Sequence, residues 1–371
     1  MTRDDTPVVI TGSRTRLKRA TLLDVSGALG LDLLPDGART EVVIIGAGPA
    51  GLAASVYAAS EGLDVVTLDG RAPGGQAGTS SKIENYLGFP TGISGRELAE
   101  RAMVQAQKFG ARIASPVTAR RLIAEPDGYW VELKDGRRIH TQSVVLACGA
   151  DYRRLDIDDI KPYEGSGVYY GATAMEAQLC GGANVAVVGA GNSAGQGAVF
   201  LSKVARDVHV LFRRGDLRET MSDYLVRRLE ETPNIHLHPR SEVCAVTGDG
   251  QRLTGITRVE GLERTPVPMD VPFLFLFIGA TPCTEWLPET VARDAAGFLK
   301  TGPEISNLEL VRARWTLERM PTIYETSWPR VYAVGDVRVG SVKRVASSVG
   351  EGSVVVQYLH KAMRDVLTPA A

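Results

Sequence analysis

The sequence has few cysteines, and they lie far apart. Its 371 residues contain four, Cys148, Cys180, Cys244 and Cys283, with no C-x-x-C pair and no spacing typical of a zinc site. We therefore expect free thiols in a reducing compartment rather than a disulfide framework. No metal site is predicted.

Long apolar runs and an excess of charge are missing as well. The most hydrophobic stretch, VPFLFLFIGA at 271–280, is too short to cross a bilayer and predicts a buried strand. The N-terminus lacks the apolar core of a secretory signal, which predicts a cytoplasmic protein. With 42 basic and 43 acidic residues, the net charge of −1 predicts no binding to nucleic acid or membrane.

Glycine is abundant, with 40 residues, and two segments use it in the same way. Residues 40–69 and 183–214 each run from an apolar β-branched strand through a glycine turn and an Ala-rich helix to a second strand. Two further stretches, GYWVELKDGRRIHTQSVVLACGA and EVCAVTGDGQRLTGITRVE, predict antiparallel hairpins. The chain is long enough for two domains, and the pattern predicts an α/β protein with two Rossmann-like dinucleotide-binding domains.

The first glycine turn has a full G-x-G-x-x-G spacing in Gly46, Gly48 and Gly51, directly after a strand and at the start of a helix. The first glycine permits the tight turn, the second lets a pyrophosphate approach, and the third lets the helix pack on the strand. Asp69 closes the next strand, where its carboxylate can accept hydrogen bonds from an adenosine ribose.

The second turn is the variant G-x-G-x-x-A, formed by Gly189, Gly191 and Ala194, and no acidic residue closes the following strand. Three arginines stand there instead: Arg213, Arg214 and Arg218. Guanidinium groups match a ribose 2′-phosphate, so this site is predicted to prefer NADPH to NADH. The alternative is that the arginines form a solvated loop face.

These residues, with the motifs GGQAGTSSKIENYLGFP, VVLACGA, RRGDLR and VYAVGDVRVGSVKRVASSVGEGS, resemble the low-molecular-weight thioredoxin reductase family of FAD- and NADPH-dependent flavoproteins. The resemblance covers residues 41–365. It implies three-layer ββα domains: a discontinuous FAD-binding domain of residues 41–157 and 280–371, with an NADPH-binding domain of residues 158–279 inserted. It also implies a homodimer.

The resemblance further implies the residues that bind each cofactor. For FAD they are Gly46, Gly48, Pro49, Ala50, Gly51, Asp69, Gly74, Gly75, Gln76, Asn85, Ala147, Gly149, Gly335, Asp336, Arg344, Val345 and Ala346. For NADPH they are Gly189, Gly191, Asn192, Ser193, Ala194, Arg213, Arg214 and Arg218.

The redox-active cysteine pair of the family is missing from this sequence. Aligned through GV before and VAVVGAGN after, its two positions hold Gly171 and Ala174. Thiol–disulfide exchange needs a thiolate, so direct reduction of thioredoxin by this route is not expected. A segment of small residues replaces the pair, and we expect it to serve catalysis by leaving space beside the flavin: Gly171, Ala172, Thr173 and Ala174.

Neighbouring side chains allow two interpretations. Tyr169 and Tyr170 either line a substrate pocket beside that segment or complete a core strand. Cys180 and Cys148 are interpreted as packing residues rather than replacements for the lost pair. His236 shares a strand face with His238, and without a third ligand in view we expect a solvated face rather than a metal site.

Residues 1–40 precede the resemblance. They contain a predicted short strand, PVVIT, and a helical-period stretch that together resemble the end of a thioredoxin- or glutaredoxin-like domain, which would make the extension a remnant of one. We expect the helix to pack on its own domain or across a dimer. A basic cluster could face an acidic carrier but is more typical of a solvated face: Arg14, Arg16, Lys18 and Arg19.

The leading hypothesis is therefore an NADPH-dependent FAD oxidoreductase that passes electrons to an external acceptor, a small molecule or a carrier protein, without a disulfide. One alternative is a FAD-dependent oxidase acting on a bound metabolite. The other is a catalytically silent flavin- and nucleotide-binding sensor. The sequence does not specify the acceptor.

Overall fold

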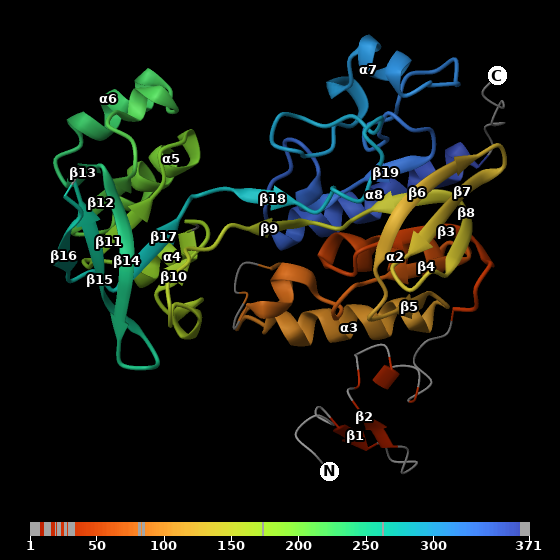
Figure 1. Ribbon diagram of the computed structural model, residues 1–371, viewed down its shortest axis with the longest axis horizontal. Helices are drawn as coiled ribbons and strands as arrows, with labels where there is room; N and C mark the ends of the chain where they lie inside the picture. The colour runs from red at the N-terminus through yellow and green to blue at the C-terminus, as the bar shows by residue number, and fades with distance from the viewer. Residues whose placement is uncertain are drawn as a thin grey trace. The chain divides into compact units, whose positions relative to one another are not determined.

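The computed structural model describes residues 34–80, 83, 86–172, 174–261 and 263–363, and within the N-terminal extension residues 8–10, 16–18, 20, 24, 25 and 28. The chain divides into unit 1, residues 1–151 and 281–371, and unit 2, residues 152–280. It crosses between them in β9 (Ala150–Tyr152) and β18 (Ala280–Pro282), which form a two-stranded sheet (Figure 1). The domain bounds expected from the sequence, 157/158 and 279/280, lie six residues after and one residue before these unit bounds.

Unit 1 is built on a sheet in which β5, β4, β3 and β8 are parallel neighbours and β19 adds to β8. An antiparallel extension, β7 and then β6, continues from β8, and the predicted KDG hairpin is its β7–β8 turn. The strands are β3 (Ala38–Ile45), β4 (Val65–Leu68), β5 (Arg112–Ala114), β6 (Ala119–Glu125), β7 (Gly128–Leu133), β8 (Arg138–Leu146) and β19 (Val331–Ala333).

Helices α2 (Pro49–Ser60), α3 (Gly95–Lys108) and α8 (Val345–Ala362) belong to the same unit. Alternate residues of β3 explain the layers: Val42 and Ile44 pack with residues of α2 and α8, whereas Val43 and Ile45 pack with residues of β6 and β7. Helix α2 is rich in alanine because α8 approaches it closely. A Cβ on Gly352 of α8 would lie 2.1 Å from the carbonyl oxygen of Ala50.

Unit 2 has a five-stranded parallel sheet in the order β10–β17–β11–β12–β13 (Figure 1). A separate antiparallel sheet follows the order β14–β15–β16. The strands are β10 (Val168–Tyr169), β11 (Asn184–Val188), β12 (Asp207–Phe212), β13 (Ile235–Pro239), β14 (Ser241–Gly248), β15 (Leu253–Glu260), β16 (Thr265–Met269) and β17 (Phe273–Leu276), and the helices are α4 (Ala174–Leu179), α5 (Asn192–Leu201) and α6 (Asp223–Glu231).

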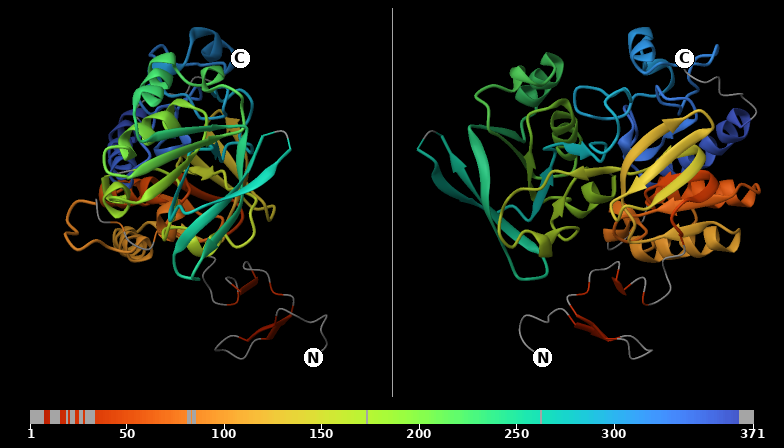
Figure 2. Two further views of the ribbon diagram at one scale, coloured as in Figure 1. Left: turned by 90° about the vertical axis from the view of Figure 1, so that its left-hand side faces the viewer. Right: turned by 45° about the vertical axis from the view of Figure 1, so that its right-hand side comes forward.

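The two faces of β11 show why unit 2 has three layers. Val185 and Val187 pack with residues of α5 and α6, whereas Ala186 and Val188 pack with residues of β14 and β15. Figure 2 shows the long β14 and β15 strands as a layer separate from these helices. The predicted ββα arrangement of Rossmann-like domains, including the second hairpin and the buried strand at 271–280, is therefore confirmed.

The remaining elements are short. They are helix α7 (Asn307–Arg312) and the 3₁₀ turns η2 (Gly75–Thr79), η3 (Lys161–Tyr163), η4 (Leu217–Glu219), η5 (Gly302–Glu304) and η6 (Gly335–Val337). In the extension, β1 (Val8–Ile10) pairs antiparallel with β2 (Arg16–Lys18), a second strand that the sequence did not predict. Most of the predicted helix of the extension lies outside the described residues, as do Arg14 and Arg19. None of the helices in the described part of the chain has the length and apolar character that a bilayer crossing requires.

Candidate active site

The first glycine turn has the geometry of a dinucleotide cradle. Gly46 has a φ of +106°, and a Cβ there would lie 2.4 Å from the carbonyl oxygen of Ala147. A Cβ on Gly51 would lie 1.8 Å from the carbonyl oxygen of Gly46, so only glycine lets the helix start so close to the strand. Gly48 is different: it has ordinary φ, and a Cβ there would meet nothing nearer than the Cα of Gly75, at 3.8 Å.

The space beside Gly48 is therefore open because glycine has no side chain, and the backbone there is not strained. Gly48 is the N-cap residue of α2, and no side chain caps the helix. The free N–H groups of a helix start attract phosphate, and the open approach gives it access. The turn fits a pyrophosphate.

Three segments that are distant in the sequence meet this turn. A Cβ on Gly75 would lie 3.0 Å from the Cα of Gly48, and Gly74 donates its N–H to Ala47 (2.7 Å). Ala147 lies against Gly46, as described above. From the C-terminal part, a Cβ on Gly335 would lie 2.9 Å from the Cβ of Ala50. Unit 1 thus brings together glycines and neighbouring residues that the sequence assigned to one cofactor.

Asp69 fixes the turn from the next strand. Its Oδ2 accepts the N–H of Ala47 (2.9 Å), and its Oδ1 accepts the N–H of Arg71 (2.8 Å). Asp69, which is predicted to bind the ribose, is thus fixed beside the glycine turn. Each of its carboxylate oxygens retains a lone pair for a ribose hydroxyl. Further along, Gln76 donates its amide to Asp151 (2.9 Å).

The loop before α8 contains charged residues that the sequence analysis missed. Glu351 of α8 accepts the N–H of Gly335 (2.7 Å) and pairs with Arg338 (2.7 Å), which fixes the turn at Gly335. Burial raises the pKa of Asp336, and burial lowers the pKa of Lys343, whose Nζ donates to the Asp336 carbonyl (3.1 Å). Of these charged residues only Asp336 was expected at the site. The others lie outside the positions that the glycine motif specifies.

The start of α8 is chemically suited to negative charge. Arg344 is its N-cap residue, and Val345 and Ala346 begin its first turn. That turn carries no acidic side chain, so the positive end of the helix dipole is uncompensated.

The second glycine turn repeats the plan in unit 2. Gly189 has a φ of +149°, and a Cβ there would lie 2.6 Å from the carbonyl oxygen of Phe277. Gly191, like Gly48, has ordinary φ, and a Cβ there would meet nothing within 4 Å. Ala194 is buried at the start of α5. The side chain of Asn192 accepts the N–H of Ser222 (2.8 Å), and Ser193 follows in the first turn of α5.

The three arginines after β12 do not act as one cluster. Arg214 pairs with Glu219 (2.6 Å), and Arg218 forms two hydrogen bonds to Glu230 (2.9 and 3.0 Å). The Glu230 carboxylate raises the pKa of Arg218, whose guanidinium in turn lowers the pKa of Glu230. Arg213 instead lines a surface pocket of about 270 Å³.

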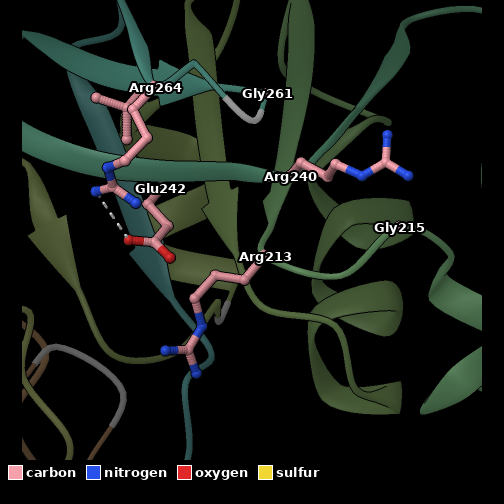
Figure 3. Close-up of a pocket in the computed structure, with 7 residues that line it drawn as sticks. Arg213, Gly215, Arg240, Glu242, Gly261 and Arg264 are labelled. Carbon is pink, nitrogen blue, oxygen red and sulfur yellow. Dashed lines mark hydrogen bonds and ion pairs between the residues drawn. The ribbon is translucent and has the colours of Figure 1, made fainter.

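That pocket contains further arginines which the sequence analysis did not single out. Figure 3 shows Arg264 and Glu242 turned toward each other, in an ion pair of 3.5 Å, and Arg240 extending toward Gly215. The pocket is lined by Arg213, Gly215, Arg240, Glu242, Val259, Gly261 and Arg264. Its basic character follows from the fold and not from one motif, because its members come from the loop after β12, the junction of β13 and β14, β14 itself, β15 and the β15–β16 turn.

The thiols of Cys148 and Cys180 have the properties of packing residues. The Sγ of Cys148 donates to the carbonyl of Cys283 (3.1 Å), and burial raises the pKa of Cys148 to about 12. The Sγ of Cys180 donates to the carbonyl of Glu176 (2.7 Å), and burial raises its pKa to about 11. Thiols with such pKa values carry little thiolate at neutral pH.

The segment expected to replace the cysteine pair follows β10. A Cβ on Gly171 would meet nothing within 4 Å, and Ala174 begins α4. Thr173, like Asn85 of the predicted FAD site, lies outside the described residues. Gly171 and Ala172 are partly exposed.

Of the two interpretations of Tyr169 and Tyr170, the structure favours the core strand. Tyr169 stacks on Phe275 with ring centres 5.4 Å apart. Tyr170 stacks on Tyr152 (5.5 Å), and its hydroxyl donates to Glu164 (2.6 Å). Both rings pack on the core of unit 2, Tyr169 from the edge strand β10 and Tyr170 from the residue that follows it. The pocket interpretation of these two side chains is not supported.

The histidine face of unit 2 has a third member. His209 of β12 is the register partner of His236, and its Nδ1 lies 3.0 Å from Nε2 of His238. His236 pairs with Asp207 (2.8 Å). Within the described residues no group of three or more histidine, cysteine or acidic side chains is arranged to hold a metal ion.

This histidine face should make the protein less stable in mild acid. Burial, and then the nearby Arg258, lowers the pKa of His238 to about 4, and burial lowers that of His209. An unfolded histidine, with its pKa near 6.5, binds more protons than the folded one between pH 6.5 and 4, so stability falls as the pH drops through that window. We expect a loss on the order of 2 kcal/mol.

The free energy of unfolding of the full chain in urea, measured at pH 7 and pH 4.5, tests this loss. His238→Gln should flatten the difference between the two pH values, whereas His360→Gln, on α8 of unit 1, should leave it unchanged. An equal pH dependence in the wild type and His238→Gln would contradict the assignment.

Comparison with known proteins places this geometry in a family. Residues 40–352 match the family model of pyridine nucleotide-disulphide oxidoreductases. A thioredoxin reductase of Schizosaccharomyces pombe is 33% identical over 329 residues, which cover 85% of this chain and 94% of that protein. A thioredoxin reductase of Mycoplasmopsis pulmonis is 30% identical, over 86% of this chain and 96% of that protein.

Solved structures agree. The thioredoxin reductase of Streptococcus pyogenes superposes with a TM-score of 0.76 at 26% identity, over 88% of this chain and 99% of that chain. The enzyme of Giardia duodenalis superposes with a TM-score of 0.77 at 25% identity, over 88% of this chain and 100% of that chain. The chain therefore belongs to the pyridine nucleotide-disulphide oxidoreductase family, as an oxidoreductase of the thioredoxin reductase type, a type that uses FAD and NADPH.

Proposed function

We propose that this chain is an NADPH-dependent FAD oxidoreductase that delivers electrons to an external acceptor without an active-site disulfide. The observation that carries the proposal is a contrast within one molecule. Both glycine turns are complete, whereas residues 171–174 contain no cysteine. The thiols of Cys148 and Cys180 are engaged in packing and have raised pKa values.

Unit 1 would bind FAD. The Gly46–Gly51 turn would receive the pyrophosphate, Asp69 the ribose, and the segments at 74–76, 147–149 and 335–336 would enclose the cofactor because they contact that turn. When bound, FAD supplies a group that accepts two electrons as hydride from NADPH and passes them on. The start of α8, at Arg344–Ala346, would stabilise the negative charge of the reduced state.

Unit 2 would bind NADPH. Gly191 leaves open space at the start of α5, as Gly48 does at α2, and the absence of an acid at the end of β12 removes the residue that would repel a 2′-phosphate. The arginine-bearing loop after β12 would attract that phosphate instead. This assignment predicts NADPH rather than NADH as the electron donor.

The acceptor would approach the partly exposed segment at 171–172. Because a Cβ on Gly171 would meet nothing within 4 Å, this stretch leaves space where a disulfide would otherwise stand. The acceptor would be a small molecule or a redox carrier protein. The family resemblance supports a homodimer in a reducing, cytoplasmic setting.

Anaerobic mixing of the flavin-containing protein with NADPH, and separately with NADH, tests the proposal. Flavin absorbance should bleach rapidly with NADPH and at least about tenfold more slowly with NADH, because a lost charge-assisted hydrogen bond costs more than about 1.4 kcal/mol. The reduced protein should then reoxidise with artificial acceptors. Thioredoxin should not reoxidise it.

Dithionite provides the control, because it reduces a bound flavin directly and does not need the nucleotide site. Bleaching by dithionite but not by NADPH would contradict the proposal and favour a sensor or a metabolite oxidase. NADPH-dependent reduction of thioredoxin by the unaltered chain would contradict the disulfide-free route.

A further inference from the structure

Arg218, which the sequence assigned to the 2′-phosphate, is already surrounded by acidic side chains. Glu230 binds it with two hydrogen bonds, Asp223 lies 3.3 Å from its Nε, and Asp216 lies 3.7 Å from its Nη1. Three carboxylates thus already compensate the charge of this guanidinium. Arg214 is similarly paired with Glu219.

Arg213 and Arg240 are in the opposite situation. Among the described residues, no ion pair involves either of them. Both side chains are exposed, and both line the same pocket. Arg264, the third arginine of that pocket, is paired with Glu242. The two unpaired guanidinium groups are therefore the ones available to an incoming anion.

The strand register places these two residues at the carboxyl-terminal ends of two neighbouring strands. Phe212 and Pro239 face each other in the last register pair of β12 and β13, and the next residues along each strand are Arg213 and Arg240. The carboxyl ends of parallel strands are where α/β domains bind ligands. The N–H of Arg240 also donates to the carbonyl of Arg214 (3.1 Å), so the two loops are tied together.

The backbone of Arg240 supports a specific role for this side chain. Its φ is +49°, in the left-handed region that a non-glycine residue seldom occupies. Such conformations persist where the surrounding structure requires them, often at ligand sites. A Cβ on Gly215 would lie 3.5 Å from Nη2 of Arg240, so the guanidinium lies over the turn that follows Arg213.

We infer that Arg240 joins Arg213 in recognising the 2′-phosphate of NADPH, and that Arg218 serves mainly to join η4 to α6 through Glu230. The inference rests on the proposed function of unit 2 and names the residues that set its choice of nucleotide. Arg240 lies 26 positions beyond Arg214, outside the motif that predicted the specificity.

Calorimetric titration of the full-length, flavin-containing protein with 2′,5′-ADP, and with 5′-AMP as the probe lacking the phosphate, tests this. Arg213→Ala and Arg240→Ala should each weaken 2′,5′-ADP binding by at least about tenfold and leave 5′-AMP binding unchanged. Arg218→Ala should weaken it less than about threefold. Arg240→Gly, which accepts a positive φ without strain, should behave like Arg240→Ala.

Arg252→Ala is the matched control, because it removes one exposed arginine from the β14–β15 turn of the same unit. It should change neither affinity. If the wild type binds 2′,5′-ADP no better than 5′-AMP, the proposed preference for NADPH fails. If the wild type shows the preference but both Arg240 variants keep it, or Arg218→Ala loses it, the inference fails while the proposed function stands.

Discussion

Gly48→Ala should give a folded protein that purifies almost without flavin. The added Cβ would lie 3.8 Å from the Cα of Gly75, an ordinary contact, and the φ of −74° suits any residue. The polypeptide alone therefore accepts alanine. A pyrophosphate that must approach the start of α2 does not, because the methyl group occupies its path.

The expected loss of FAD affinity is on the order of 100-fold, since one or two hydrogen bonds to a charged group, each about 1.5–3 kcal/mol, would be broken. The ratio of flavin absorbance to protein measures it. The thermal midpoint of the variant should match that of wild-type protein stripped of flavin, because the fold itself is unaltered.

Two other glycines serve as controls. Gly51→Ala should lower the stability even of the flavin-free protein, because its Cβ would lie 1.8 Å from the carbonyl oxygen of Gly46. Gly191→Ala should keep its flavin and lose reduction by NADPH, because it blocks the corresponding approach in unit 2. A Gly48→Ala protein with full flavin content would contradict the assignment of unit 1.

The second large effect is a gain of function in Gly171→Cys combined with Ala174→Cys. The pair restores the spacing of the family's disulfide, and a side chain at 171 meets nothing within 4 Å. We expect NADPH-dependent reduction of thioredoxin to rise roughly 100-fold over background, since a thiol pair supplies the nucleophilic exchange that the native segment lacks.

Gly171→Ser combined with Ala174→Ser is the matched control, because serine has nearly the size of cysteine but cannot form a disulfide. It should stay at background. If the double-cysteine protein forms the disulfide, as thiol titration would reveal, and still does not reduce thioredoxin, the missing pair is not what redirects the electrons.

Local patterns in the sequence predicted most of the fold. The strand–glycine–helix segments at 40–69 and 183–214 form parallel sheet units, and both predicted hairpins form where their turn residues stand. These features depend on residues a few positions apart, so spacing alone determines them. Gly46, Gly51 and Gly189 also have the close backbone contacts that only glycine allows, and Gly48 and Gly191 leave the open approach that the motif requires.

The features that the sequence did not predict depend on which strands and helices become neighbours. His209 meets His238, and Arg213 meets the pocket of Arg240, because β12 and β13 pair in one particular register. Arg218 is engaged because α6 brings Glu230, twelve positions away, against it. The roles of Arg213, Arg218 and Arg240 toward the nucleotide stay predictions.

The discontinuity of unit 1 has a consequence for synthesis. Strand β19 pairs with β8, and α8 packs closely on α2 through Gly352, so unit 1 lacks part of its sheet and a helical wall until the last ninety or so residues have been made. Unit 2 is continuous and is complete by residue 280. During synthesis on the ribosome, unit 2 can thus fold first, while the N-terminal part of unit 1 still exposes the hydrophobic face that β19 and α8 will cover.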